Sequence, residues 1–172
     1  MTAARRRGHR GRAAAALALL VGLTVAAGPA QAAGWGGITP GETLRRDVEA
    51  RYGPPSRTRT VTEGDRTAVE WVYAGDRAPR GAERMVVSFG LLTGGRFQPD
   101  LVRALTLYPS PGVFRVRALT EGWGKPDAIG TDEQTGRPAL RYDRQGLLVI
   151  LDKTGEWAET MLFAPPQVPA PR

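Results

Sequence analysis

Residues 39–55 read TPGETLRRDVEARYGPP, and the stretch that begins 71 residues later, 110–126, reads SPGVFRVRALTEGWGKP. Extended without a gap, the comparison of residues 39–75 with residues 110–146 gives nine identities in 37 pairs. A composition rich in Gly, Arg and Ala would give about three by chance. Most of the shared residues are glycines, prolines and other positions that begin or end structural elements, so the sequence predicts an internal repeat.

Each copy is expected to begin with a helix. In the first copy Thr39 is positioned as an N-cap, a proline follows it, and Gly53 provides a left-handed stop. The second copy has the same plan, with Ser110 as the cap and Gly124 as the stop. The spacing therefore predicts one helix between each cap and its glycine.

Strand patterns separated by short turns follow each helix. Short turns favour antiparallel hairpins, and a helix placed only at the start of each copy favours helices on one face of an antiparallel sheet. The predicted class is α+β, with two tandem helix-then-antiparallel-strands repeats forming one sheet and the helices packed on one face. The expected strands are residues 57–62, 68–73, 84–89, 101–108, 126–131, 138–142, 147–151 and 157–163.

An export signal is predicted for residues 1–32. This segment has five arginines near its start, an apolar stretch over residues 13–27, and the small-residue cleavage site Ala30-Gln31-Ala32. The apolar stretch is shorter than the roughly 20 residues that a bilayer-spanning helix needs. We therefore expect a periplasmic or secreted product.

The rest of the chain is expected to divide into three parts. Residues 33–109 form the first repeat and residues 110–163 the second, with almost no linker between them. Residues 164–172 contain four prolines and little apolar mass, which predicts a disordered, extended tail.

Composition excludes several kinds of chemistry. The sequence has no Cys, and its one His, His9, lies in the predicted signal. Without imidazole or thiol there is no Ser-His-Asp or Cys-His catalysis and no His- or Cys-ligated metal site. There is also no thiol for a lipid anchor. Neither a cofactor nor a bound metal is expected.

Charge argues against a nucleic-acid partner. The formal net charge of +7 falls by five when the predicted signal is removed, and the remaining acidic residues are interspersed with the arginines. Nucleic-acid binding usually needs basic residues gathered on one surface together with stacking aromatics.

Two short motifs were weighed as chemical sites. Asp152-Lys153-Thr154-Gly155 matches the phosphorylated aspartate motif of P-type ATPases, but it lies between two strand patterns and is better explained as a hairpin turn. Residues 131–136 are rich in oxygen ligands that could hold calcium, yet they too are typical of a solvated turn.

Several segments together resemble a known family. The order of helix, Gly-x-Pro stop and a strand with Trp or Tyr resembles the SmpA/OmlA-like domains of small outer-membrane assembly lipoproteins, and the tandem arrangement is similar to the β-lactamase inhibitor protein. The resemblance implies a protein-binding module of the cell envelope. It is carried by residues 39–41, 52–55, 70–73, 123–126, 147–152 and Gly155.

Candidate binding residues come from the strand alternation. Trp71, Tyr73 and Tyr142 are expected to pack beneath the helices, so their strand neighbours would lie on the opposite face of the sheet. Aromatic and arginine side chains are favoured at binding hot spots. The partner-binding residues predicted on these grounds are Glu70, Val72, Arg141, Asp143, Trp157 and Trp35.

The sequence therefore predicts an exported, monomeric binding or accessory module of the cell envelope. It would act through a surface for another protein or an envelope polymer, without catalysis. One alternative is a small hydrolase or lyase of envelope polymers that uses paired carboxylates. Another is a structural accessory domain without a dedicated ligand.

Overall fold

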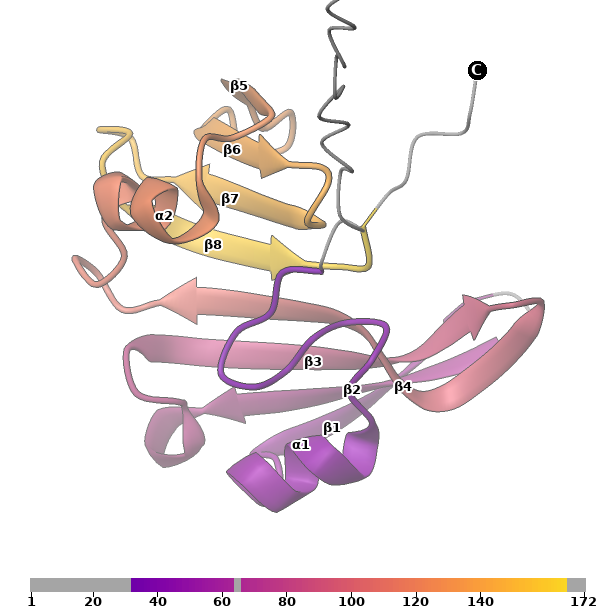
Figure 1. Ribbon diagram of the computed structural model, residues 1–172. Coiled ribbons are helices and arrows are strands. Elements are labelled where there is room, and N and C mark those ends of the chain that lie inside the picture. The colour runs from indigo at the N-terminus through magenta and orange to yellow at the C-terminus, as the bar shows by residue number, and fades with distance from the viewer. Residues whose placement is uncertain (1–31, 64–65, 167–172) are drawn as a thin grey trace, which may run out of the picture.

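A computed structural model describes residues 32–63 and 66–166, and its centre is one antiparallel sheet of eight strands (Figure 1). The strand order across the sheet is β1-β2-β3-β4-β8-β7-β6-β5. The elements are α1 (Arg45–Tyr52), β1 (Arg57–Glu63), β2 (Arg66–Ala74), a 3₁₀ turn (Gly75–Arg77), β3 (Ala82–Thr93), β4 (Arg96–Pro109), α2 (Val116–Trp123), β5 (Ala128–Thr131), β6 (Pro138–Tyr142), β7 (Leu147–Leu151) and β8 (Ala158–Phe163).

All eight predicted strands are present, and the alternation of their side chains explains the core. Antiparallel pairing places directly opposed residues on the same face of a sheet. Two rows of buried side chains therefore cross the six strands from β2 to β6. The first row is Trp71, Val87, Leu105, Phe163, Leu147 and Tyr142, and the second is Tyr73, Met85, Leu107, Met161, Val149 and Leu140.

The predicted α+β class of two tandem helix-then-strands repeats is wrong. The described part of the chain is mainly β: one eight-stranded sheet dominates it, and the two α-helices found there have only eight residues each. The expected helix starts at Thr39 and Ser110 are where the prediction fails, since the helices begin at Arg45 and Val116.

Positive backbone angles explain the shortened helices. Gly41 has φ +85° and Gly112 has φ +75°, and neither angle fits a right-handed helix. Gly41 instead donates its N–H to the carbonyl of Val102, and Val102 donates to the carbonyl of Thr43. Residues 41–43 therefore pair with β4 and do not form part of the helix.

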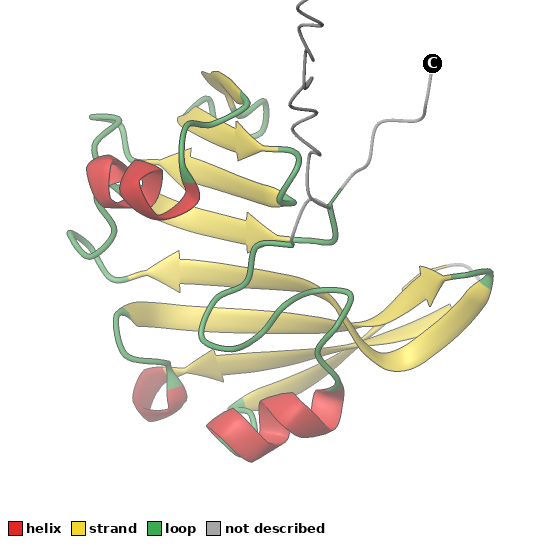
Figure 2. Ribbon diagram, viewed as in Figure 1, coloured by secondary structure: helices red, strands yellow, loops and turns green. Residues whose placement is uncertain are grey.

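One face of the sheet is covered and the other is not. Both helices and residues 33–44 lie on the same side, with the N-terminal segment crossing the middle strands between the helices (Figures 1 and 2). The covering elements contribute three side chains to the buried hydrophobic core: Ile38 from the N-terminal segment, Val48 from α1 and Leu119 from α2. No helix in the described part of the chain lies on the opposite side, which we call the open face.

Candidate interaction surface

The open face carries one continuous row of residues that crosses all eight strands. Its members are directly opposed from strand to strand, so they share that face. We call this row the belt. From β1 to β5 it consists of Arg57, Val72, Val86, Thr106, Leu162, Leu148, Arg141 and Ala128.

The belt has an apolar middle with an arginine towards each end. Val86, Leu162 and Leu148 are half-buried, whereas Arg57 and Arg141 are exposed. Six strand intervals separate the two arginines, which corresponds to about 29 Å at the usual strand spacing of ~4.8 Å. An apolar centre with polar groups at the rim is the general organisation of a protein-binding surface.

Arg141 and Asp143, both predicted binding residues, lie together on β6 and just beyond it. Nη2 of Arg141 is 2.9 Å from Oδ1 and 3.0 Å from Oδ2 of Asp143. Arg141 also lines two hollows, one of about 190 Å³ that reaches Leu162 and Pro165, and one of about 410 Å³ that reaches the turn after β5. Arg141 therefore borders both hollows, and Asp143 lines the smaller one.

Glu70 and Val72, two further predicted residues, lie on β2 at the other half of the open face. Oε1 of Glu70 accepts a hydrogen bond of 3.0 Å from Oγ of Ser88. Val72 is only 5% exposed, so it supports the surface from below and offers little area to a partner. Five strand intervals separate Val72 from Arg141, or about 24 Å, so the two predicted pairs belong to opposite ends of one face.

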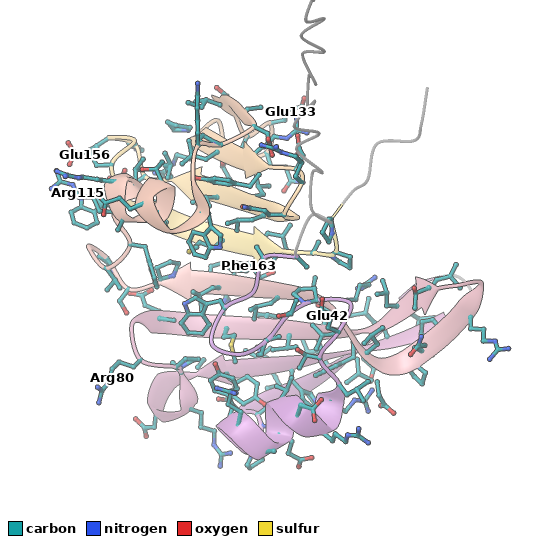
Figure 3. The ribbon with its side chains drawn as sticks, in the orientation of Figure 1. Glu42, Arg80, Arg115, Glu133, Glu156 and Phe163 are labelled. Carbon is teal, nitrogen blue, oxygen red and sulfur yellow. The ribbon has the colours of Figure 1, made fainter. Side chains whose placement is uncertain are left out.

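The two predicted tryptophans lie apart from the belt. Trp35 is half-buried, forms a bridge with Ile38 and packs against the core on the covered side. Trp157 precedes β8, where the guanidinium of Arg115 lies 5.5 Å from the centre of its ring. Arg115 also forms an ion pair of 3.4 Å with Glu156, and these two side chains lie side by side at the end of the sheet in Figure 3.

Three exposed arginines on the open face were missed by the sequence analysis. Arg57 and Arg59 extend from β1 on either side of a threonine, and Arg84 lies on β3 next to the belt. The guanidinium of Arg84 lies 3.8 Å from the ring centre of Tyr108, directly across on β4. The Arg-Thr-Arg alternation could have placed Arg57 and Arg59 together, because residues two apart on a strand share a face.

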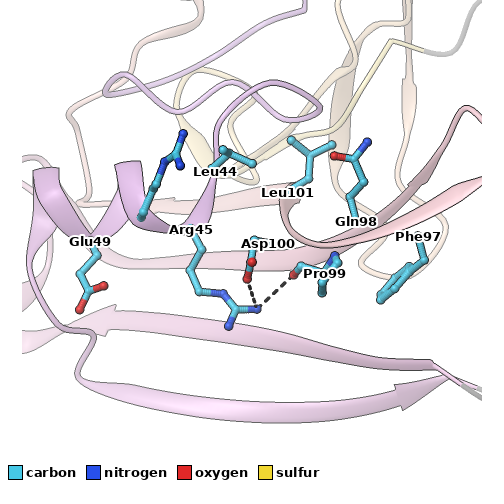
Figure 4. Close-up of a pocket in the computed structure, with 9 residues that line it drawn as sticks. Leu44, Arg45, Glu49, Phe97, Gln98, Pro99, Asp100 and Leu101 are labelled. Atoms are coloured by element: carbon cyan, nitrogen blue, oxygen red, sulfur yellow. Dashed lines mark hydrogen bonds and ion pairs between the residues drawn. The ribbon is translucent and has the colours of Figure 1, made fainter.

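A third hollow, of about 460 Å³, lies between α1 and the first half of β4 (Figure 4). Nη2 of Arg45 donates a 3.1 Å hydrogen bond to the carbonyl of Pro99 and is 3.2 Å from Oδ1 of Asp100. The same guanidinium lies 5.1 Å from the ring centre of Phe89 and 5.9 Å from that of Trp71. Arg45 thus joins α1 to the sheet, and a contact across 54 residues left no local sequence signal.

The two motifs weighed as chemical sites both form hydrogen-bonded turns. Oδ1 of Asp152 accepts from the backbone N–H groups of Glu156 (3.0 Å) and Trp157 (3.1 Å), and the hydroxyl of Thr154 bonds the same carboxylate. These bonds, led by the Thr154 hydroxyl, lower the pKa of Asp152. Asp132 is held in the same way by Thr135, which lowers its pKa as well.

Residues 32–63 and 66–166 contain no group of three or more His, Cys, Asp or Glu side chains arranged to hold a metal ion. Within those residues neither helix is long and apolar enough to cross a bilayer. The predicted signal, apart from Ala32, and residues 167–172 of the predicted tail lie outside the described residues.

Comparison with known proteins gives one distant structural likeness. No protein-family model and no curated protein sequence matches the chain. The crystal structure of a DUF4309 family protein, YjgB from Bacillus subtilis, is similar with a TM-score of 0.47 and 14% sequence identity. The alignment covers 75% of this chain and 82% of that one.

Proposed function

We propose that the protein is an exported binding module of the cell envelope, which captures another protein through the open face of its sheet and performs no catalysis. The observation that carries this proposal is the belt. Its middle holds the half-buried apolar side chains of Val86, Leu162 and Leu148, from β3, β8 and β7, and no helix of the described chain lies over them. The apolar faces of a sheet are usually covered, so an uncovered apolar strip indicates a binding surface.

The energetic case rests on the middle of the belt. Leu148 and Leu162 are directly opposed on β7 and β8 and are both half-buried. Completing the burial of each would contribute roughly 1 kcal/mol, at ~25 cal/mol for each Å² of apolar surface. A surface about 29 Å wide also suits the roughly 800 Å² that each partner buries in a standard interface.

The location belongs to the same proposal. It rests on the order of basic start, apolar stretch and cleavage site in residues 1–32, which is typical of export signals. The resemblance to SmpA/OmlA-like domains points to the same compartment and to protein binding. We expect a periplasmic or secreted monomer without a lipid anchor.

Site-specific photo-cross-linking in the native host tests the proposal. One full-length gene carries the photoreactive residue at Leu162, in the belt, and a control carries it at Glu121, whose side chain is 65% exposed on α2. We expect one dominant protein, identified by mass spectrometry, cross-linked from position 162 and not from position 121. Leu148→Asp should abolish that product while the circular dichroism spectrum stays unchanged.

Equal products from both positions would contradict the proposal, because the open face would then have no special role. A complete absence of product from position 162, with the protein exported and folded, would contradict it too.

A further inference from the structure

We propose that the partner is an acidic protein surface, whose carboxylates bind the three arginines at the β1–β3 end of the open face. This inference rests on the open-face binding proposed above and adds the partner's chemistry and orientation. We call Arg57, Arg59 and Arg84 the arginine triangle.

The triangle projects from one side of the sheet. Arg57 and Arg59 are two residues apart on β1, or about 7 Å, and Arg84 lies two strands away and further along the sheet, about 12 Å from Arg57 and about 17 Å from Arg59. All three side chains are exposed. Arg57 is directly opposite Val72 and Arg84 is two residues from Val86 on β3, so a partner that contacts this end of the belt also meets the arginines.

The described acidic side chains leave the triangle largely uncompensated. Glu70 is directly opposite Arg59, yet its carboxylate accepts from Ser88 and forms no ion pair with Arg59. Among the described side chains, Arg57 and Arg59 have no ion-pair partner.

The opposite end of the face differs in this respect. Arg141 is paired with Asp143 at 2.9 Å, and Arg137 with Glu159 at 2.9 Å. The open face therefore has a neutralised end at β6 and a positive end at β1–β3. This asymmetry would orient an acidic partner across the belt, since complementary charges mainly set register and association rate.

Arg84 is prepared to bind a carboxylate. Its guanidinium lies 3.8 Å from the Tyr108 ring centre, which holds the group against the ring face. The edge of a guanidinium can donate two parallel hydrogen bonds to one carboxylate. A side chain held in place before binding loses less entropy when the partner arrives.

A protein fits this surface better than a phosphate polymer. Phosphate chains satisfy arginines but leave apolar side chains such as Val86 and Leu162 uncovered. Nucleic-acid-binding surfaces also carry a much larger positive field, whereas the arginines here alternate with threonine and valine. A partner that binds both the belt and the triangle needs carboxylates next to apolar side chains on its surface.

Selection from a random twelve-residue peptide display library tests this inference on the exported protein. We expect enriched peptides that combine Asp or Glu with apolar residues. For one such synthetic peptide, Arg57→Glu with Arg59→Glu should raise Kd at least about tenfold, as loss of close charge pairs does. The matched control, Arg46→Glu with Arg117→Glu, changes the charge equally on the covered side and should alter Kd less than twofold.

The remaining outcomes separate this inference from the proposed function. One outcome is that the enriched peptides lack acidic residues, no longer bind the Leu148→Asp variant and still bind the double arginine variant. This outcome would overturn the inference of an acidic partner and leave the proposal of open-face binding intact. Displacement of the peptide by sodium polyphosphate at equal charge concentration would also overturn it. An unenriched library, or peptides affected by neither open-face variant, would count against both.

Discussion

The hydroxyl of Tyr73, on β2, donates a hydrogen bond of 3.1 Å to the carbonyl of Gly53, the residue that caps the end of α1. Tyr73 is fully buried, and its ring lies 5.8 Å from that of Tyr52 between centres. Tyr52 in turn donates a 2.8 Å bond to the carbonyl of Gly36. The two tyrosines thus fasten the end of α1 and the N-terminal segment to the sheet, which closes the covered face.

Removing the Tyr73 hydroxyl should destabilise the protein measurably. Tyr73→Phe leaves the Gly53 carbonyl without this donor, at an expected cost of about 1–2 kcal/mol in the free energy of unfolding. Urea titrations at pH 7, followed by circular dichroism, measure the difference. A variant as stable as the wild type would show that solvent replaces the bond.

Alkaline pH should act on the same group. Burial, aided by the negative charge of Glu49, raises the pKa of Tyr73 to about 12. Because the folded pKa lies above the unfolded value near 10, the stabilisation is complete below pH 10 and is lost as pH rises towards 12. Urea titrations between pH 8 and 11 should show a smaller decline for Tyr73→Phe than for the wild type. Equal declines in the free energy of unfolding for the two proteins would show that Tyr73 is not the source of the lost stability at high pH.

The turn between β7 and β8 should weaken in acid through Asp152. Its pKa is lowered by the Thr154 hydroxyl and the following backbone N–H groups, so its stabilising effect is present above about pH 4 and is lost as pH falls through the lowered value. Asp152→Ala should lower the thermal midpoint at pH 7, and the gap should close towards pH 2. Lys153→Ala, in the same turn, is the control and should match the wild type throughout.

The strands could be predicted from the sequence because their signal is local. Residues such as Val69, Trp71 and Tyr73 alternate with residues of the other face, and turn residues bound each run, so all eight strands were found. The helix starts could not be placed in this way. Thr39 and Ser110 resemble N-caps, but the angles of Gly41 and Gly112 and the pairing of Gly41 with β4 depend on distant residues.

The same distinction applies to the candidate surface. Alternation correctly placed Glu70, Val72 and Arg141 on the face opposite the buried aromatics. It could not reveal that Val72, Leu162 and Arg141 belong to one row, since the register of five intervening pairings sets that relation. Nor could it separate Trp35 and Trp157 from that row, because bridges to Ile38 and Arg115 hold them elsewhere.

Two leucines of the β3–β4 hairpin should respond very differently to truncation. Leu105 is fully buried in the first core row, whereas Leu92 is 51% exposed near the tip of the hairpin. Leu105→Ala should cost about 2–5 kcal/mol, because it removes buried apolar area and leaves a cavity. Leu92→Ala should remain within about 0.5 kcal/mol of the wild type. Similar losses in urea unfolding would contradict the assigned burial.

Two glycines with nearly equal backbone angles should separate conformational strain from steric conflict. Gly146 has φ +69° and Gly155 has φ +73°, so alanine is strained at both, by roughly 1 kcal/mol. A Cβ at Gly146 would also collide with the backbone of Ala164, which donates its N–H to the Gly146 carbonyl at 2.8 Å. At Gly155 the nearest atom, of Pro138, is 4.0 Å away. Gly146→Ala should therefore lower the free energy of unfolding clearly more than Gly155→Ala. Equal losses would mean that the chain after β8 moves aside, and that the link between Ala164 and the turn after β6 contributes little to the fold.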